Sequence, residues 1–183
     1  MAVLKCLRAL AVAVLLVPQL AAAAPSEYQV KAVFLFNFSR FVEWPAAAFA
    51  NANAPLVMCI FGQDPFGADL DEVVKGEVVN GRPLLIRRVQ MVAQTSECHI
   101  LFIHKSEDRR LTEAPSALEH RSTLTVSDVP GPAQRGVMIR LVTEQGRIRL
   151  RINVESARAA NLSISSNLLR SAEIVAQTAN GGR

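Results

Sequence analysis

Nearly uninterrupted runs of apolar residues limit the folds that this chain can adopt. They occupy residues 56–61 (LVMCIF), 98–103 (CHILFI) and, more briefly, 124–126. A strand that is apolar at every position is buried on both faces, as in a parallel sheet covered by helices. Residues 84–89 form a less apolar strand pattern, which we expect near an edge of the sheet.

Helix signals alternate with these strands. Ser26 is a candidate N-cap for a helix over 27–42, and the Asp64-Pro65 pair can start a helix that ends near residue 75. A third helix is predicted over 107–120. The alternation predicts an α/β fold with a mainly parallel sheet flanked by helices, arranged as an α/β/α sandwich.

The C-terminal part has a different pattern, an antiparallel hairpin. Residues 137–143 and 147–154 flank Gln145-Gly146, and a two-residue turn makes the numbers of facing residues sum to 291. One face then collects Ile139, Leu141, Thr143, Ile148, Leu150 and Ile152, and the other Arg140, Val142, Glu144, Arg147, Arg149 and Arg151. Two helices are predicted to follow, over 155–160 and 167–177.

The polar face of this hairpin is strongly basic. Glu144 lies opposite Arg147, but Arg140 lies opposite Arg151, and like charges in facing positions are unfavourable. Either acidic neighbours neutralise a solvated face, or a partner does. Arg140, Arg149 and Arg151 are therefore candidate partner-binding residues.

The first predicted helix carries half of the eight phenylalanines, which lie between residues 34 and 41. Such a helix is apolar on more than one face. It is either enclosed in the core or shared with a partner or a second copy of the chain. Phe38 is the candidate for a partner contact, and its alternative place is the core.

The N-terminus has the layout of a cleaved signal peptide. Lys5 and Arg8 precede an apolar run over 9–20, and four alanines follow over 21–24. We expect removal of residues 1–23, export to the periplasm and a single domain over 24–183. Losing the two cations lowers the formal net charge from +4 to +2, and no basic run or set of stacking aromatics predicts nucleic-acid binding.

Two cysteines, Cys59 and Cys98, remain after cleavage. An even count in an oxidising compartment favours a disulfide, which would stabilise the fold by at most about 4 kcal/mol. The alternative is two separate buried thiols.

Motifs for catalysis are missing from the sequence: it contains no complete phosphate loop, no HExxH and no GxSxG. Asp64, His104 and Asp128 follow predicted strands, at the edge where α/β proteins bind ligands. They are candidate ligand-binding residues, although capping and ordinary hydrogen bonding explain them too. We predict no enzyme activity, no cofactor and no metal.

Seven stretches together resemble the YfiR family of exported proteins. They are YQVKAVFLFNFSRFVEWP (28–45), VMCIFGQDPFG (57–67), GRPLLIRRV (81–89), CHILFIHKSED (98–108), LTVSD (124–128), GVMIRLVTEQGRIRLRIN (136–153) and ANLSISSNLLRSAEIV (160–175). Their order along the chain makes the set specific, although each stretch alone is modest.

The resemblance implies a periplasmic repressor of an inner-membrane diguanylate cyclase, linking envelope or redox state to cyclic-di-GMP signalling. It implies two further partners, an outer-membrane lipoprotein of the YfiB type and a second copy of the chain. Cys59 and Cys98 match one disulfide pair of the family, whereas residues 129–152 lack the second pair of some relatives. The alternative function is a periplasmic sensor of a small ligand.

Overall fold

The computed structural model describes residues 24–110, 117–118, 121–129 and 137–175, so the predicted leader over 1–23 lies outside the described residues. The N-terminal half contains α1 (Glu27–Phe41), β1 (Val42–Glu43), η1 (Ala46–Ala48), β2 (Leu56–Phe61), α2 (Ala68–Val74), β3 (Val78–Val79), β4 (Arg82–Val89) and η2 (Val92–Glu97). The C-terminal half contains β5 (Ile100–Ile103), η3 (Lys105–Arg110), β6 (Leu124–Ser127), β7 (Ile139–Glu144), β8 (Arg147–Ile152), α4 (Val154–Ala159), β9 (Ser163–Ile164), α5 (Ser166–Leu169) and β10 (Ala172–Ile174).

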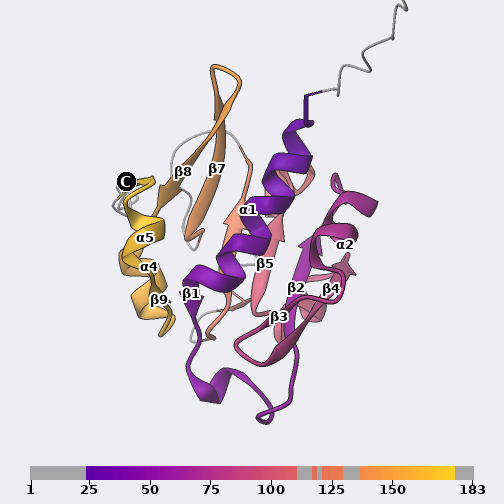
Figure 1. Ribbon diagram of the computed structural model, residues 1–183, viewed down its shortest axis with the longest axis vertical. Helices are drawn as coiled ribbons and strands as arrows, with labels where there is room; N and C mark the ends of the chain where they lie inside the picture. The colour runs from indigo at the N-terminus through magenta and orange to yellow at the C-terminus, as the bar shows by residue number, and fades with distance from the viewer. Residues whose placement is uncertain (1–23, 111–116, 119–120, 130–136, 176–183) are drawn as a thin grey trace, which may run out of the picture.

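The main sheet has eight strands in the order β10-β8-β7-β6-β5-β2-β4-β3 (Figure 1). Strands β4, β2, β5, β6 and β7 are parallel, whereas β7–β8 and β4–β3 are antiparallel pairs. The predicted α/β fold with a C-terminal hairpin is therefore confirmed. The weakly apolar strand β4 lies one strand from the sheet edge, as expected.

Alternation along β2 shows how the sheet is covered on both faces. Met58 and Ile60 belong to the larger core, which α1, α2 and the C-terminal helices share. Cys59 and Phe61 point to the opposite face, into a smaller core that includes Val92 of η2. All four β2 side chains are fully buried, which explains why this run is apolar throughout.

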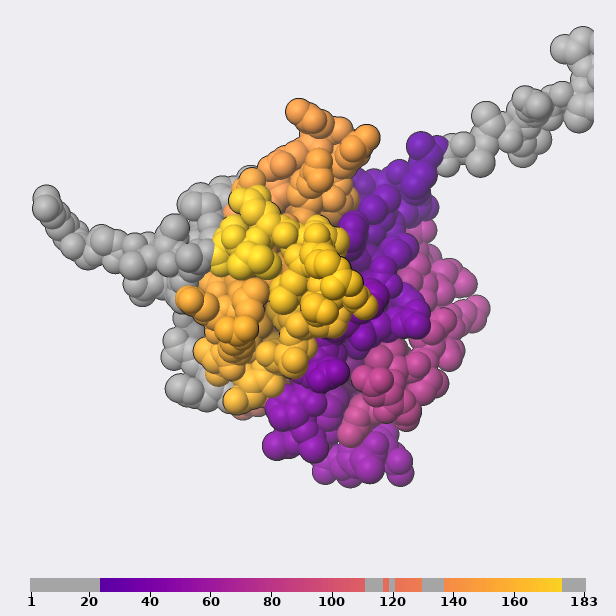
Figure 2. All heavy atoms as spheres, turned by 60° about the vertical axis from the view of Figure 1, so that its left-hand side comes forward, coloured from indigo at the N-terminus to yellow at the C-terminus, as the bar shows by residue number. Residues whose placement is uncertain are grey.

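Helix α1 crosses the larger core and meets the C-terminal segment at its far end (Figures 1 and 2). Beyond its last turn, β1 pairs with β9, and the Ser165 N–H donates to the Phe41 carbonyl at 2.8 Å. Ser26 caps α1 as predicted, in a reciprocal capping box with Gln29. The first and last parts of the described chain are thus joined through α1.

The hairpin has the predicted register. Arg140 lies opposite Arg151, Glu144 opposite Arg147, and the turn at Gln145-Gly146 has positive φ at both residues. Positive φ at both central positions matches the right-handed twist of the two strands. The hairpin projects beyond the rest of the sheet in Figure 1.

The predicted helix over 167–177 is wrong. A short helix, α5, ends at Leu169, and β10 then adds to the outer edge of β8. The Val175 N–H donates to the Ile152 carbonyl at 2.9 Å, and Glu173 forms an ion pair with Arg151. Pairing at an open sheet edge outweighs the weak helical pattern here. Residues 176–177 lie outside the described part.

Two other helices differ from expectation. Helix α2 starts only at Ala68, because the Asp64 carboxylate accepts the N–H groups of Phe66 and Gly67 and holds the chain in a turn. The helix predicted over 107–120 begins in η3, a 3₁₀ segment, while residues 111–116 and 119–120 lie outside the described ranges.

Candidate functional site

A buried polar cluster lies at the carboxyl end of the parallel strands, under the first turns of α1. Its centre is Asp128, directly after β6, whose side chain is 1% exposed. Tyr28 Oη donates to Asp128 Oδ2 at 2.8 Å, Lys31 Nζ to the same oxygen at 2.9 Å, and the Lys105 N–H to Oδ1 at 3.0 Å. We call Tyr28, Lys31, His104 and Asp128 the strand-end cluster.

His104 completes the strand-end cluster. Its Nδ1 accepts the Ser106 N–H at 3.2 Å, so the neutral ring carries its proton on Nε2. Nε2 lies 3.3 Å from Tyr28 Oη, and the Tyr28 hydroxyl donates its hydrogen bond to Asp128. Burial is the main cause that lowers the pKa of His104, although Asp128 acts in the opposite direction. A neutral imidazole fits this chain of hydrogen bonds.

Lys31 balances the charge of the strand-end cluster. Its Nζ lies 2.6 Å from Glu27 Oε1 as well as 2.9 Å from Asp128, and 4.6 Å from the centre of the Tyr28 ring. The hydrogen bond from Lys31 lowers the pKa of Glu27. Burial, reinforced by Asp128, raises the pKa of Tyr28. The phenol therefore stays protonated and serves as a donor.

The strand-end cluster acts as a latch between α1 and the sheet. Among the described residues, every buried side-chain nitrogen or oxygen has a hydrogen-bond partner. The carboxylate of Asp128 accepts three donors, two at Oδ2 and one at Oδ1. Its chemistry is that of a structural ion-pair network, in which loss of one partner is costly.

The predicted ligand residues are only partly brought together. His104 and Asp128 meet in the strand-end cluster, but Asp64 caps the turn before α2 and pairs with Arg88 Nε at 2.7 Å. A ligand site formed by all three remains a prediction, and their present hydrogen bonds are all internal. Among the described residues, no group of three or more His, Cys, Asp or Glu is arranged to hold a metal ion.

Sequence reasoning missed Tyr28 and Lys31. The signal for Lys31 was its position: it precedes Leu35, Phe38 and Val42 at helical spacing, on the face that is fully buried. A lysine in such a stripe needs a buried anion, and the aspartate that ends a buried strand supplies it.

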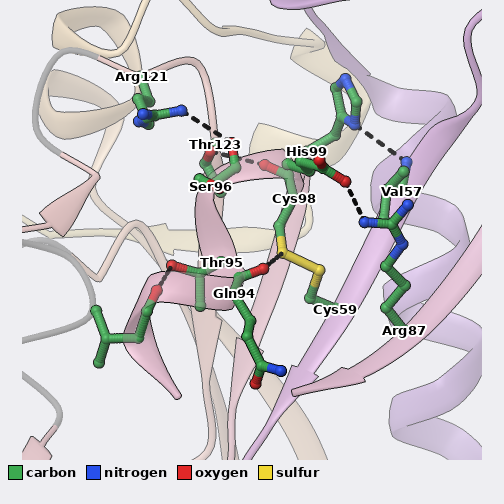
Figure 3. Close-up of a disulfide and its surroundings, with 12 residues drawn as sticks. Val57, Cys59, Arg87, Gln94, Thr95, Ser96, Cys98, His99, Arg121 and Thr123 are labelled. Atoms are coloured by element: carbon green, nitrogen blue, oxygen red, sulfur yellow. Dashed lines mark hydrogen bonds and ion pairs between the residues drawn. A yellow bond between two sulfur atoms is a disulfide. The ribbon is translucent and has the colours of Figure 1, made fainter. Parts of the chain in front are cut away.

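The predicted disulfide is confirmed: Cys59 in β2 is bonded to Cys98, just before β5, with a Cα–Cα distance of 5.7 Å (Figure 3). Cys59 is fully buried and Cys98 is 4% exposed. The bridge ties β2 to the segment between η2 and β5. Arg121 donates to the carbonyl of Ser96, in η2 just before Cys98, at 2.9 Å, which further fixes this part of the chain.

His99, next to the disulfide, anchors the loop after α1. Its Nδ1 accepts the Val57 N–H at 3.1 Å, and its Nε2 donates to the Ala48 carbonyl at 3.1 Å (Figure 3 shows the first bond). The ring stacks on Phe49 with 4.4 Å between centroids, and the Arg82 guanidinium lies over the Phe49 ring at 3.7 Å. Burial lowers the pKa of His99, and the neutral ring is the form in which Nδ1 can accept the Val57 N–H.

Two of the predicted partner-binding residues are in the interior. Phe38 is fully buried in the larger core, which corrects its assignment as a partner contact and supports the alternative. Arg140 is 5% exposed and donates to the Val129 carbonyl at 2.8 Å, so its guanidinium is not offered to a partner either. Burial, with repulsion from Arg151, lowers the pKa of Arg140.

Arg149 and Arg151 remain candidates on the surface. Arg149 is exposed, and Arg151 forms ion pairs with Glu144 and Glu173, each at 3.0 Å. Acidic neighbours therefore neutralise Arg151, which is one of the two ways in which the facing charges of Arg140 and Arg151 were expected to be compensated. A partner contact at these two arginines stays a prediction.

The described chain is an α/β domain in which the strand-end cluster joins α1 to the sheet. The chain belongs to the YfiR/HmsC-like family, whose model matches residues 28–173. The matched range includes the strand-end cluster, the disulfide and the hairpin, and it confirms the resemblance seen in the sequence. A search of curated proteins finds no match. In the described part of the chain, no helix is long and apolar enough to cross a membrane.

Proposed function

We propose that this chain is a periplasmic regulatory protein that binds and represses an inner-membrane diguanylate cyclase. The observation that carries the proposal is the match to the YfiR/HmsC-like family over residues 28–173. The proposal includes cleavage of residues 1–23 and export, which the disulfide between Cys59 and Cys98 supports because such bonds persist in oxidising compartments.

The structure supports regulation by contact. The strand-end cluster holds α1 against the sheet, β1–β9 holds its other end, and the disulfide fixes β2. A protein braced in this way presents a rigid surface and loses little conformational entropy on binding. On the hairpin, the exposed Arg149 guanidinium is available to steer an acidic partner surface.

The test is capture of the cyclase. Tagged mature chain is incubated with detergent-solubilised membranes of the source cell, and captured proteins are identified by mass spectrometry. We expect a membrane diguanylate cyclase among the specific captures. Its absence, with good bait recovery and the cyclase detectable in the input, would contradict the proposal.

The contribution of the hairpin is tested with matched charge reversals. Arg149→Glu is expected to weaken capture without lowering the melting temperature, because the side chain is exposed. Arg158→Glu, at a residue of α4 that is also exposed, is the control and is expected to leave capture unchanged. Equal capture by both variants would assign Arg149 to a solvated face.

Two other partners belong to the proposal. A lipoprotein of the YfiB type would compete with the cyclase for the chain, and added soluble lipoprotein should then reduce capture. A second copy would make the chain a dimer, and light scattering at micromolar concentration measures this. An unchanged capture, or a monomer throughout, would remove the respective partner.

A further inference from the structure

A groove with apolar walls lies between α1 and α2, away from the strand-end cluster and the hairpin. Its volume is about 580 Å³, and its walls include Val30, Val33 and Phe34 of α1 and Val73 of α2. Asp69 and Glu72 of α2 also line it, and because both are exposed to solvent we call them its rim. We call this feature the α1–α2 groove.

The groove uses a second apolar stripe of α1. Residues 30, 33, 34 and 37 line it, at the spacing of one helix face, whereas Leu35 and Phe38 point into the core. Val33 is 47% exposed, which makes it one of the most exposed large apolar side chains of the described residues. The Phe-rich helix thus has more apolar surface than the sheet covers, and the uncovered part is this groove.

The rim of the groove is acidic. Glu72 lies 3.7 Å from Lys75, but both side chains are more than 70% exposed, so water and salt screen this pair. In the described part of the chain, the Asp69 side chain accepts a neutral hydrogen bond from Gln29 at 3.3 Å. Arg88 does not line the groove and forms ion pairs with Asp64 and Asp71 instead. The rim therefore attracts cations.

We propose that the α1–α2 groove binds an amphipathic helix that has an apolar stripe and flanking Lys or Arg residues. The proposal rests on the proposed function only where it assigns this helix to the regulated protein. Two helices already form the walls, and a third packs onto such a pair through the same ridges and grooves. A small ligand is disfavoured, because its sites bury most of its surface and this groove leaves Val33 half exposed.

The direct test uses a synthetic probe. A fluorescein-labelled amphipathic peptide of about 18 residues, with a leucine stripe and lysines, spans α1 in length. Its partner peptide carries glutamate in place of lysine. Fluorescence anisotropy with the mature chain should show binding of the lysine peptide and at least about fivefold weaker binding of the glutamate peptide.

Variants locate the binding. Val33→Ser removes a half-exposed apolar contact, and Asp69→Asn with Glu72→Gln removes the rim charges. Each is expected to weaken binding of the lysine peptide about fivefold. Val78→Ser on β3 and Glu155→Gln on α4 are matched exposed controls and should bind as the wild type does. Thermal melting checks that every variant is folded.

Three results would overturn the inference. They are equal binding of both peptides, binding that Val33→Ser leaves unchanged, and conversion of a dimer to a monomer by Val33→Ser, which would place a second copy in the groove.

Capture of the cyclase separates the two proposals. If the wild type captures no cyclase, the proposed function fails whatever the peptide does. If Val33→Ser captures the cyclase as well as the wild type, the groove is not the site of the regulated partner.

Discussion

Replacing Lys31 by methionine tests the strand-end cluster, because it removes one partner of a buried ion pair and keeps an apolar stem of similar length. The side chains of Lys31 and Asp128 are 3% and 1% exposed. Removing one partner of such a pair typically costs 3–5 kcal/mol, since the other charge stays buried. Asp128 keeps the donors Tyr28 Oη and the Lys105 N–H, so we expect a loss near the lower limit, about 3 kcal/mol.

The assay is urea unfolding followed by the fluorescence of Trp44, with the disulfide intact in every sample. For a domain of this size, the expected loss corresponds to a melting temperature lower by about 6–12 °C. Lys75→Met is the matched control, because Lys75 and its partner Glu72 are both exposed, and it should cost less than about 1 kcal/mol.

A second variant shows whether the pair itself is responsible. Asp128→Asn in the Lys31→Met background removes the unpaired charge, so the double variant should be more stable than the sum of the two single losses predicts. The reasoning would be refuted if Lys31→Met cost no more than Lys75→Met, or if the two single losses were additive.

Three further predictions concern the disulfide, pH and a glycine. Joint replacement of Cys59 and Cys98 by alanine should lower the free energy of unfolding by up to about 4 kcal/mol in urea titrations, and an unchanged urea midpoint would contradict a stabilising bridge. Burial lowers the pKa of both His99 and His104 in the folded state. As the pH falls below about 6.5, these histidines therefore take up protons in the unfolded chain before they do so in the folded one. The free energy of unfolding should thus be highest above about pH 6.5 and decrease below it. Equal urea midpoints at pH 7.5 and pH 5.5 would contradict this. Gly62→Ala should destabilise by about 1–3 kcal/mol in thermal melts, since φ is +91° and the new Cβ would lie 2.5 Å from Glu107 Cγ, whereas Gly76→Ala, with open space around it, should cost less.

Patterns with a strict period could be predicted from the sequence. The buried run of β2 and the facing residues of β7 and β8 follow from alternation and a two-residue turn, and the structure has both. The disulfide was predictable because only two cysteines remain in the expected mature chain.

Features that depend on tertiary neighbours were not predictable in the same way. The segment at 172–174 has a weak helical pattern and becomes β10 only because β8 offers an unpaired edge. Phe38 is buried because the face of α1 that carries it packs against the sheet, where Asp128, directly after β6, also holds Lys31 of the same face. Local patterns give the face of a helix, whereas the fold decides what covers that face.

The central claim is repression of a diguanylate cyclase, and intracellular cyclic-di-GMP in the source cell measures it most directly. Deleting the gene for this chain should raise cyclic-di-GMP, and restoring the wild-type gene should return it to the original level. Deleting the captured cyclase as well should abolish the rise. An unchanged level after the first deletion, in cells where the cyclase is expressed, would contradict the account.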